Sequence, residues 1–474
     1  MTEDGAATAR GLARRLGPAR RIVAAALWLA SAACAHYTAR PLTPQAVKAA
    51  LATRPPTALW VRRAQLLLPS LPPLVVHKGQ RLTPDLAAVV AVVADPALRA
   101  ERAQEAVARA QVLTAGLLPN PAFSYGVGLP LPGAGLTRAF RVGLGLPIQS
   151  LVTRGPRLRA ARLHAQAVDL TVAWQEWRVA AEAKSLVYAL LVGRAQRRLL
   201  AREVHALRHS VAILADGEAA GYVTLGVAGA ARLALRHTEV VALSVHRHLA
   251  EVALALRGLL GLGARAPLPL TRHDVPAWHG RGCMRATPWL KGLARRRLDL
   301  LALRKGYRSQ DAVLREAIAA QFPAITVGVN RARDTSNVNT IGAGVSITLP
   351  IFNDNQGAIA QARATRRALF RAYAARVFTA RAGIHQLTVR MRYVRRELVR
   401  TESSVHALTH LETVYHTALA KHSIAALTYY QLLEQLVKER LVLLQDRAEL
   451  DQLAVAVEAA SGRFEWPKTC IAPS

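Results

Sequence analysis

A pattern of two short strand-like segments followed by a long helical tract occurs twice in this 474-residue chain. Pro121 and Pro323 open the two copies, and Pro147 and Pro350 close their second strand-like segments at nearly the same offset. A repeat of this length indicates a duplicated structural unit, so the chain is expected to fold as two related halves. The four strand-like segments cover residues 121–129, 138–148, 322–331 and 340–352.

Large apolar residues alternate with small or polar residues within each segment. Phe123, Tyr125 and Val127, for example, alternate with Ser124 and Gly126. Because successive side chains of a strand point to opposite faces, each segment has one apolar and one small or polar face. A soluble hairpin explains one such pair, but segments of about ten residues are typical of strands that cross a bilayer. The polar face suits a water-filled lumen, and its predicted lining residues are Ser124, Arg141, Thr326, Asn330, Ser346 and Thr348.

Four strands are too few to close a barrel by themselves. An open sheet edge leaves backbone groups unpaired, which lipid does not tolerate. Several copies of the chain are therefore expected to contribute strands to one barrel.

Two tracts of more than one hundred residues contain no proline. They begin after Pro156 and Pro350 and are rich in alanine, leucine and arginine, so each predicts a hairpin of long helices, with Pro156 in the first turn of its helix. A helix of about 60 residues is about 90 Å long. The hairpins are expected to turn near residues 216–222 and 418–424. Shorter helices are predicted over residues 85–118, 222–262, 286–320 and 425–460.

The amino-terminal residues follow the order of a secretory signal. Five arginines precede residue 22, an apolar run covers 22–30, and small residues follow up to Ala35. Two interpretations of its cleavage remain open, with a lipid on Cys34 or with ordinary cleavage after Ala35. The predicted division is a signal at 1–35, an extension at 36–80, repeats at 81–262 and 286–460, a connection at 263–285 and a tail at 461–474.

Three motifs resemble those of the TolC-type outer-membrane factors, the exit ducts of tripartite efflux systems. They lie at residues 116–121 before the first strand, 321–328 in the third strand and 349–362 at the entry to the second long helix. The likeness extends over about residues 80–460. Within this family, the chain more specifically resembles the branch that serves heavy-metal RND pumps.

The resemblance implies a mainly α fold with a transmembrane β-barrel portion. Each protomer of a homotrimer would give four strands to a twelve-stranded barrel in the outer membrane of a Gram-negative bacterium, continued by a periplasmic α-helical tunnel. It implies outer-membrane lipids, a periplasmic adaptor (membrane fusion protein) and an inner-membrane RND-type pump as partners. It also implies heavy-metal cations as cargo, with drugs as the alternative. The predicted adaptor-docking residues are Asp216, Gly217, Glu218, Gly221, Lys421 and His422.

No motif of catalytic chemistry is found, so the protein is not expected to be an enzyme or to hold a cofactor. His273, His279, Cys283 and Met284 lie in the connection between the repeats, where such side chains can bind copper or zinc. Their spacing is irregular, and tight binding would obstruct a duct. These four residues remain weak candidates, and no metal site is assigned.

The net charge of +33, from 63 basic and 30 acidic residues, is typical of proteins that bind nucleic acid or an anionic surface. An export signal contradicts a role with nucleic acid, so none is predicted as a partner. The basic residues are scattered in pairs and triplets, as on solvated helix faces. The alternative function is a periplasmic helical adaptor or scaffold without a pore.

Overall fold

The computed structural model describes residues 37–52, 81–131, 137–270, 284–421 and 423–463. The chain divides into two units. In the first, Met1–Arg54, the described residues form helix α3 (Pro44–Ala52), which begins where the Ala46 amide donates to the Thr43 hydroxyl at 3.1 Å. The second unit, Pro55–Ser474, holds the other described elements. Cys34 and the predicted signal lie outside the described residues.

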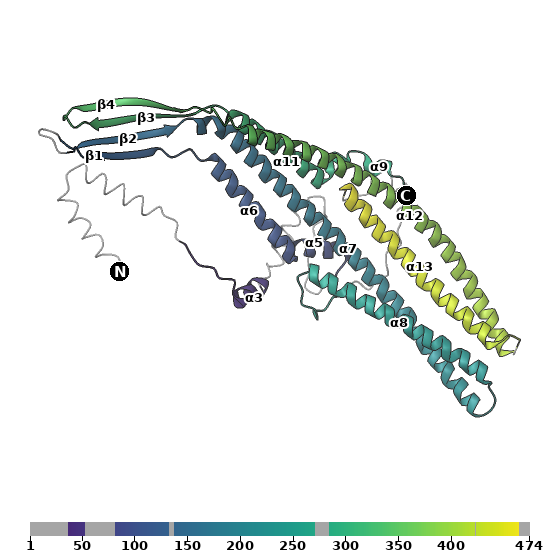
Figure 1. The fold of residues 1–474 in the computed structure, drawn as a ribbon. Coiled ribbons are helices and arrows are strands. Elements are labelled where there is room, and N and C mark those ends of the chain that lie inside the picture. The colour runs from purple at the N-terminus through teal and green to yellow at the C-terminus, as the bar shows by residue number, and fades with distance from the viewer. Residues whose placement is uncertain (1–36, 53–80, 132–136, 271–283, 422, 464–474) are drawn as a thin grey trace. The chain divides into compact units, whose positions relative to one another are not determined.

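The second unit contains the two predicted halves in sequence (Figure 1). The elements of the first half are α5 (Pro84–Ala94), α6 (Pro96–Gly116), β1 (Ala122–Gly128), β2 (Ala139–Pro147), α7 (Gln149–Ala219) and α8 (Leu225–Leu259). Those of the second half are α9 (Thr287–Leu290), α10 (Leu293–Arg296), α11 (Leu298–Ala319), β3 (Ala324–Arg333), β4 (Asn339–Thr348), α12 (Gln356–Ala420) and α13 (Ala426–Ser461). Each half has a strand pair that leads into a long helix and a shorter returning helix, so the duplication is confirmed.

The four strands form one antiparallel sheet in the order β1-β2-β3-β4. The central pairing joins the two halves of the chain, since Leu144 of β2 lies opposite Val329 of β3. Phe123 lies opposite Leu144, and Val329 lies opposite Ala343. Strands β1 and β4 are the edges of the sheet within one chain.

Helix α7 begins earlier than predicted, because Pro156 lies inside it rather than in its first turn. A proline removes a backbone hydrogen bond and crowds the preceding residue. Here the preceding residue is Gly155, which has no Cβ to crowd. Contacts to residues outside the helix also stabilise the first turns of α7. Gln149 Nε2 donates to the Phe322 carbonyl at 2.6 Å, and Arg154 Nε donates to the Gly116 carbonyl at 2.8 Å. The helix has 71 residues, which corresponds to about 105 Å.

Two of the shorter predicted helices are broken into pieces. The segment predicted over 85–118 divides at Asp95, whose carboxylate accepts from the Ala97 amide at 2.6 Å and caps α6 just before Pro96. The segment predicted over 286–320 divides at Gly292, which has a left-handed φ of 73°. The fourth strand also ends at Thr348, short of the predicted residue 352.

Apolar clusters pack the helices of each half and then join the halves. The first cluster packs α5 against α7 and α8 through residues such as Leu86, Val187 and Leu256. A second cluster packs α9 and α10 against α12 and α13, with Trp289 fully buried. A third cluster contains Leu207 of α7 and Tyr430 of α13, so it links the two helix hairpins near their turns.

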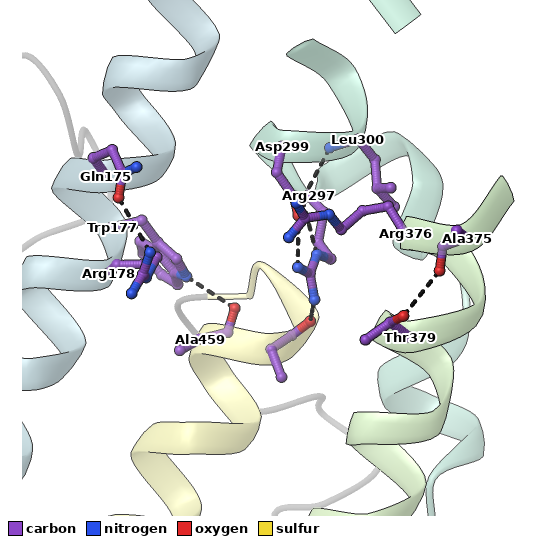
Figure 2. Close-up of polar contacts among 11 residues, drawn as sticks. Gln175, Trp177, Arg178, Arg297, Asp299, Leu300, Ala375, Arg376, Thr379 and Ala459 are labelled. Atoms are coloured by element: carbon purple, nitrogen blue, oxygen red, sulfur yellow. Dashed lines mark hydrogen bonds and ion pairs between the residues drawn. The ribbon is translucent and has the colours of Figure 1, made fainter. Parts of the chain in front are cut away.

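A polar junction joins α7, the start of α11 and the end of α13 (Figure 2). Trp177 Nε1 donates to the Ala459 carbonyl at 3.2 Å, and Arg297 Nη1 donates to the Ala460 carbonyl at 2.9 Å. The Arg297 guanidinium also lies 4.6 Å from the ring centre of Trp174. Carbonyls at a helix end lack partners within the helix. Arg297 pairs with the Ala460 carbonyl, and Trp177 adds a second donor to the Ala459 carbonyl, which also accepts from the Gly462 amide at 3.4 Å.

Candidate functional site

The register of the sheet separates its side chains into the two predicted faces. Ser124, Gly143, Asn330 and Gly342 lie opposite one another in one row across all four strands. Rows on the same face follow at steps of two residues. All six residues predicted to line a lumen therefore lie on one face of the sheet. Those residues are Ser124, Arg141, Thr326, Asn330, Ser346 and Thr348.

Glycines on the polar face allow close approach between strands. A Cβ on Gly143 would lie 2.7 Å from the Ser124 hydroxyl oxygen, and a Cβ on Gly328 would lie 2.9 Å from the Leu144 carbonyl oxygen. Both distances are shorter than van der Waals contact. The small residues therefore permit the tight pairing, and they leave Arg141 and Asn330 as the larger side chains of this face.

The opposite face is apolar and largely exposed within one chain. Phe123 is 69 % exposed, Val345 is 64 % exposed and Ile341 is 84 % exposed. Soluble proteins rarely expose a continuous apolar surface of this kind, and such a surface marks contact with another protein or a membrane.

Two arginines interrupt this apolar face near the hairpin ends. Strand β3 continues through Arg333, so Arg331 and Arg333 fall on the same face as Val327 and Val329. The prediction ended this strand at residue 331 and assigned no role to either arginine. Arg331 already lies within the predicted strand, and the period-two alternation continued by two residues would have placed Arg333 on the same face.

The turn between α7 and α8 is built on two of the predicted docking residues. Gly217 accepts backbone hydrogen bonds from the Tyr222 and Val223 amides at 2.8 and 3.1 Å. Gly221 has a φ of 78°, a conformation that residues with a Cβ rarely adopt. Glu218 pairs with Arg232 of α8 at 2.5 Å, and Tyr222 is 89 % exposed at the tip.

The turn between α12 and α13 lies at the same end of the helix hairpins. The third apolar cluster, defined above by Leu207 and Tyr430, also contains Leu214 next to the first turn and Leu419 next to the second. The Lys421 amide donates to the Thr417 carbonyl at 3.2 Å, whereas His422 lies outside the described residues. Five of the six predicted docking residues are therefore placed at two neighbouring turns.

Tyr429, near the start of α13, stabilises the turn between α12 and α13. Its hydroxyl donates to Glu412 at 3.4 Å, and its ring meets the Tyr430 ring edge-on at a centroid distance of 5.5 Å. Burial and then the negative charge of Glu412 raise the Tyr429 pKa to about 12. The phenol therefore stays neutral, as a hydrogen-bond donor to Glu412 requires.

The described residues contain no group of three or more histidine, cysteine or acidic side chains that could hold a metal ion. Of the four weak metal candidates, His273, His279 and Cys283 lie outside the described part of the chain. Met284 lies beside arginines of α12, including Arg392 and Arg396. In addition, no helix within the described ranges is apolar over a stretch long enough to cross a membrane.

No protein-family model and no curated protein matches this chain. Solved structures do match along most of their length. CusC, which forms a transmembrane channel, is 17 % identical to this chain with a TM-score of 0.67. The match covers 82 % of this chain and 95 % of the CusC chain. The outer-membrane channel OprN is 16 % identical with a TM-score of 0.68, covering 80 % and 89 %. The outer-membrane protein VceC from Vibrio cholerae is 17 % identical with a TM-score of 0.66, covering 81 % and 97 %.

These likenesses confirm the expected fold, in which a duplicated strand pair leads into long helix hairpins. A chain can keep a fold at identities this low, although its function is then argued from its own residues. The chain therefore has the fold of the solved outer-membrane channels.

Proposed function

We propose that this protein is the outer-membrane exit duct of a tripartite efflux system. In this role it is a passive channel through which substrate passes from an inner-membrane pump and a periplasmic adaptor to the exterior. The observation that carries the proposal is the two-faced sheet. One face is apolar and exposed, the other is small and polar, and both strand pairs continue into helices of 71 and 65 residues.

The two free edges of the sheet support closure by further copies. Strands alternate in direction from β1 to β4, so β4 of one copy can pair antiparallel with β1 of the next copy. An even number of strands per copy keeps this alternation around the whole ring, as a closed antiparallel barrel requires. Three copies would supply twelve strands, the number that the family resemblance implies.

Exposed apolar residues on the long helices support packing between copies in the same assembly. On α8, Leu233 and Leu243 are 66 % and 71 % exposed, and on α12 Phe378 is 75 % exposed. Neighbouring copies would cover these side chains and complete the wall of a periplasmic helical tunnel. The large apolar area otherwise left in water makes a monomer the less stable state.

The partners and cargo extend the proposal beyond the fold. The adaptor would dock at the two helix turns, where Tyr222 and Leu225 are exposed beside Gly221. Heavy-metal cations are the proposed cargo, with drugs as the alternative, on the basis of the resemblance to the branch that serves heavy-metal RND pumps. Cys34 would carry a lipid anchor in this assembly.

The first experiment is to purify the protein from outer membranes in detergent, and to measure its oligomeric mass and its single-channel conductance in a planar bilayer. A conducting trimer is expected. A correctly exported monomer without conductance would contradict the duct and favour the alternative, a periplasmic adaptor or scaffold. Metal and drug sensitivities of a deletion strain would then distinguish the two classes of cargo.

A further inference from the structure

A groove of about 390 Å³ lies on the apolar face of the sheet and has an arginine among its lining residues. Its apolar lining comes from β1, β2, β3 and β4. The groove is therefore a feature of the sheet as a whole rather than of one hairpin. Its lining includes five apolar side chains and one cationic side chain, which are Phe123, Val142, Leu144, Val329, Ile341 and Arg331.

Arg331 and Arg333 occupy the two rows of this face nearest the hairpin ends. Arg331 lies opposite Val142 and Ile341, and Arg333 lies opposite Phe140 and Asn339. In the rows that follow towards the helices, β3 presents only apolar residues, Val329, Val327 and Ile325. The groove therefore has Arg331 at one end and borders a purely apolar stretch of β3 at the other.

Arg333 is held in place by neutral groups. Its guanidinium lies 5.3 Å from the centre of the Phe140 ring, and Nη2 donates to the Arg138 carbonyl at 3.1 Å. Its Nε is buried and has no hydrogen-bond partner among the described atoms. A cation–π contact orients the side chain but does not neutralise its charge.

Neither arginine has an acidic partner among the described residues. The ion pairs there involve other arginines, such as Arg315 and Arg366 with Asp311. Asp334 follows Arg333 directly, but one of its oxygens already accepts from the Ser336 and Val338 amides at 2.9 Å each. Because β3 is an inner strand of the sheet, a neighbouring copy that pairs with β1 or β4 would not adjoin it. Both guanidinium groups therefore lack an acidic partner within the described part of the chain and are available to an anion from outside it.

We propose that this groove and the two arginines bind a phosphorylated acyl lipid of the outer leaflet. An acyl chain would lie along the groove, and the lipid phosphate would accept hydrogen bonds from Arg331 and Arg333. Guanidinium groups suit this role because their donors match phosphate oxygens in pairs. The inference rests on the proposed function, in which this face of the sheet contacts lipid.

The position of the arginines along the strand agrees with this assignment. From Ile325 to Arg333 the strand advances about 27 Å at roughly 3.4 Å per residue. The apolar band of an outer-membrane barrel is about 25 Å tall, and its strands are tilted. If Ile325 lies inside one border of the band, Arg333 lies close to the other border, where the lipid headgroups begin.

The test is to titrate the delipidated, detergent-solubilised oligomer with diphosphorylated lipid A and to count bound lipids by native mass spectrometry. The variant is the double substitution Arg331→Gln with Arg333→Gln. The matched control is Arg141→Gln, which removes an exposed arginine from the opposite face of the same sheet. We expect the double variant to bind lipid A about tenfold more weakly or worse, and the control to bind within about twofold of the wild type.

Equal binding by all three proteins would overturn the proposal. So would equal binding of dephosphorylated lipid A by the wild type, or full displacement of lipid A by millimolar inorganic phosphate, which would indicate a site for free anions. If the glutamine variant does not assemble, the double substitution to lysine keeps the charge. Its binding should lie between that of the wild type and that of a wild-type sample assayed with dephosphorylated lipid.

The outcome also separates this inference from the function on which it rests. A wild-type protein that forms no membrane-inserted oligomer would remove the duct and the lipid site together. An inserted, conducting oligomer that binds no lipid A would overturn the lipid site alone.

Discussion

Arg297 and Asp299 form a two-point ion pair although they lie only two residues apart and are almost fully buried. Nε and Nη2 of Arg297 donate to the two carboxylate oxygens of Asp299 at 2.9 and 2.7 Å, and one of those oxygens also accepts from the Leu300 amide at 2.9 Å. Arg297 at the same time closes the end of α13 through the Ala460 carbonyl (Figure 2). One side chain therefore joins the start of α11 to the end of α13.

Replacement of Arg297 by glutamine is expected to reduce the free energy of unfolding by about 3–5 kcal/mol, because it removes both guanidinium hydrogen bonds to the buried Asp299 and leaves that carboxylate only a 3.9 Å ion pair with the exposed Arg376. The matched control is Arg447→Gln, since the Arg447–Glu402 pair is 51 % and 45 % exposed. An exposed pair contributes at most about 1 kcal/mol. Denaturant unfolding of both variants checks the difference, and equal losses would contradict a special role for the buried pair.

The buried carboxyl of Asp451 is expected to lower the free energy of unfolding as pH rises. Its side chain is buried in α13, one of its oxygens has no described hydrogen-bond partner, and burial raises its pKa to about 7 from an ordinary value of 3.8. Between these pH values the folded protein binds more protons at this site than the unfolded chain does, so this carboxyl destabilises the fold progressively as pH rises from about 4 to 7.

The substitution Asp451→Asn is therefore expected to stabilise the protein above pH 7, by up to a few kcal/mol at about 1.4 kcal/mol per pKa unit. The advantage should shrink towards zero as pH falls to about 4, where the wild-type carboxyl is protonated. Thermal unfolding of both proteins from pH 4 to pH 8 measures this. A difference that is constant across that range would show that the two side chains differ in packing rather than in charge.

The turn that connects α7 to α8 depends on the backbone conformation of Gly221. Gly221→Ala is expected to destabilise the turn by about 1–2 kcal/mol, because a Cβ is unfavourable at a φ of 78°. Gly226→Ala is the matched control, since a Cβ there meets nothing within 4 Å and lies in the helix α8. Limited proteolysis should cut the Gly221→Ala turn about five- to thirtyfold faster, and unchanged cleavage would contradict the prediction.

Adjacent residues of β3 provide a test of the two faces of the sheet. If the protein is the proposed duct, Val329→Lys places a charge on its lipid-facing side, where it costs about 2–4 kcal/mol at the middle of a bilayer, so assembly in the outer membrane should fall sharply. Asn330→Lys places the same charge on the polar face and should leave assembly intact while shifting the channel towards anions. Membrane fractionation and bilayer conductance measure both. The same loss of assembly in both variants would argue against a lipid-facing and a lumen-facing side.

The alternation was predictable because it is local, and the repeat because its two copies can be compared directly in the sequence. Phe123 and Ser124 fall on opposite faces of any strand, whatever that strand pairs with. The long proline-free tracts likewise predict helices from composition. The first turns of α7 were not predictable in this way, because Gln149 and Arg154 hold them through contacts to Phe322 and Gly116, which are distant in sequence or on another element.

The sequence by itself determined that the chain is duplicated, that its four strands have an apolar and a polar face, and that long helices follow each strand pair. Only the tertiary structure decided that Leu144 lies opposite Val329, that Arg331 borders an apolar groove and that Arg297 closes the end of α13. The physical reason is the range of the interactions. Periodicity arises from neighbours along the chain, whereas register, grooves and buried ion pairs depend on residues that only folding brings together.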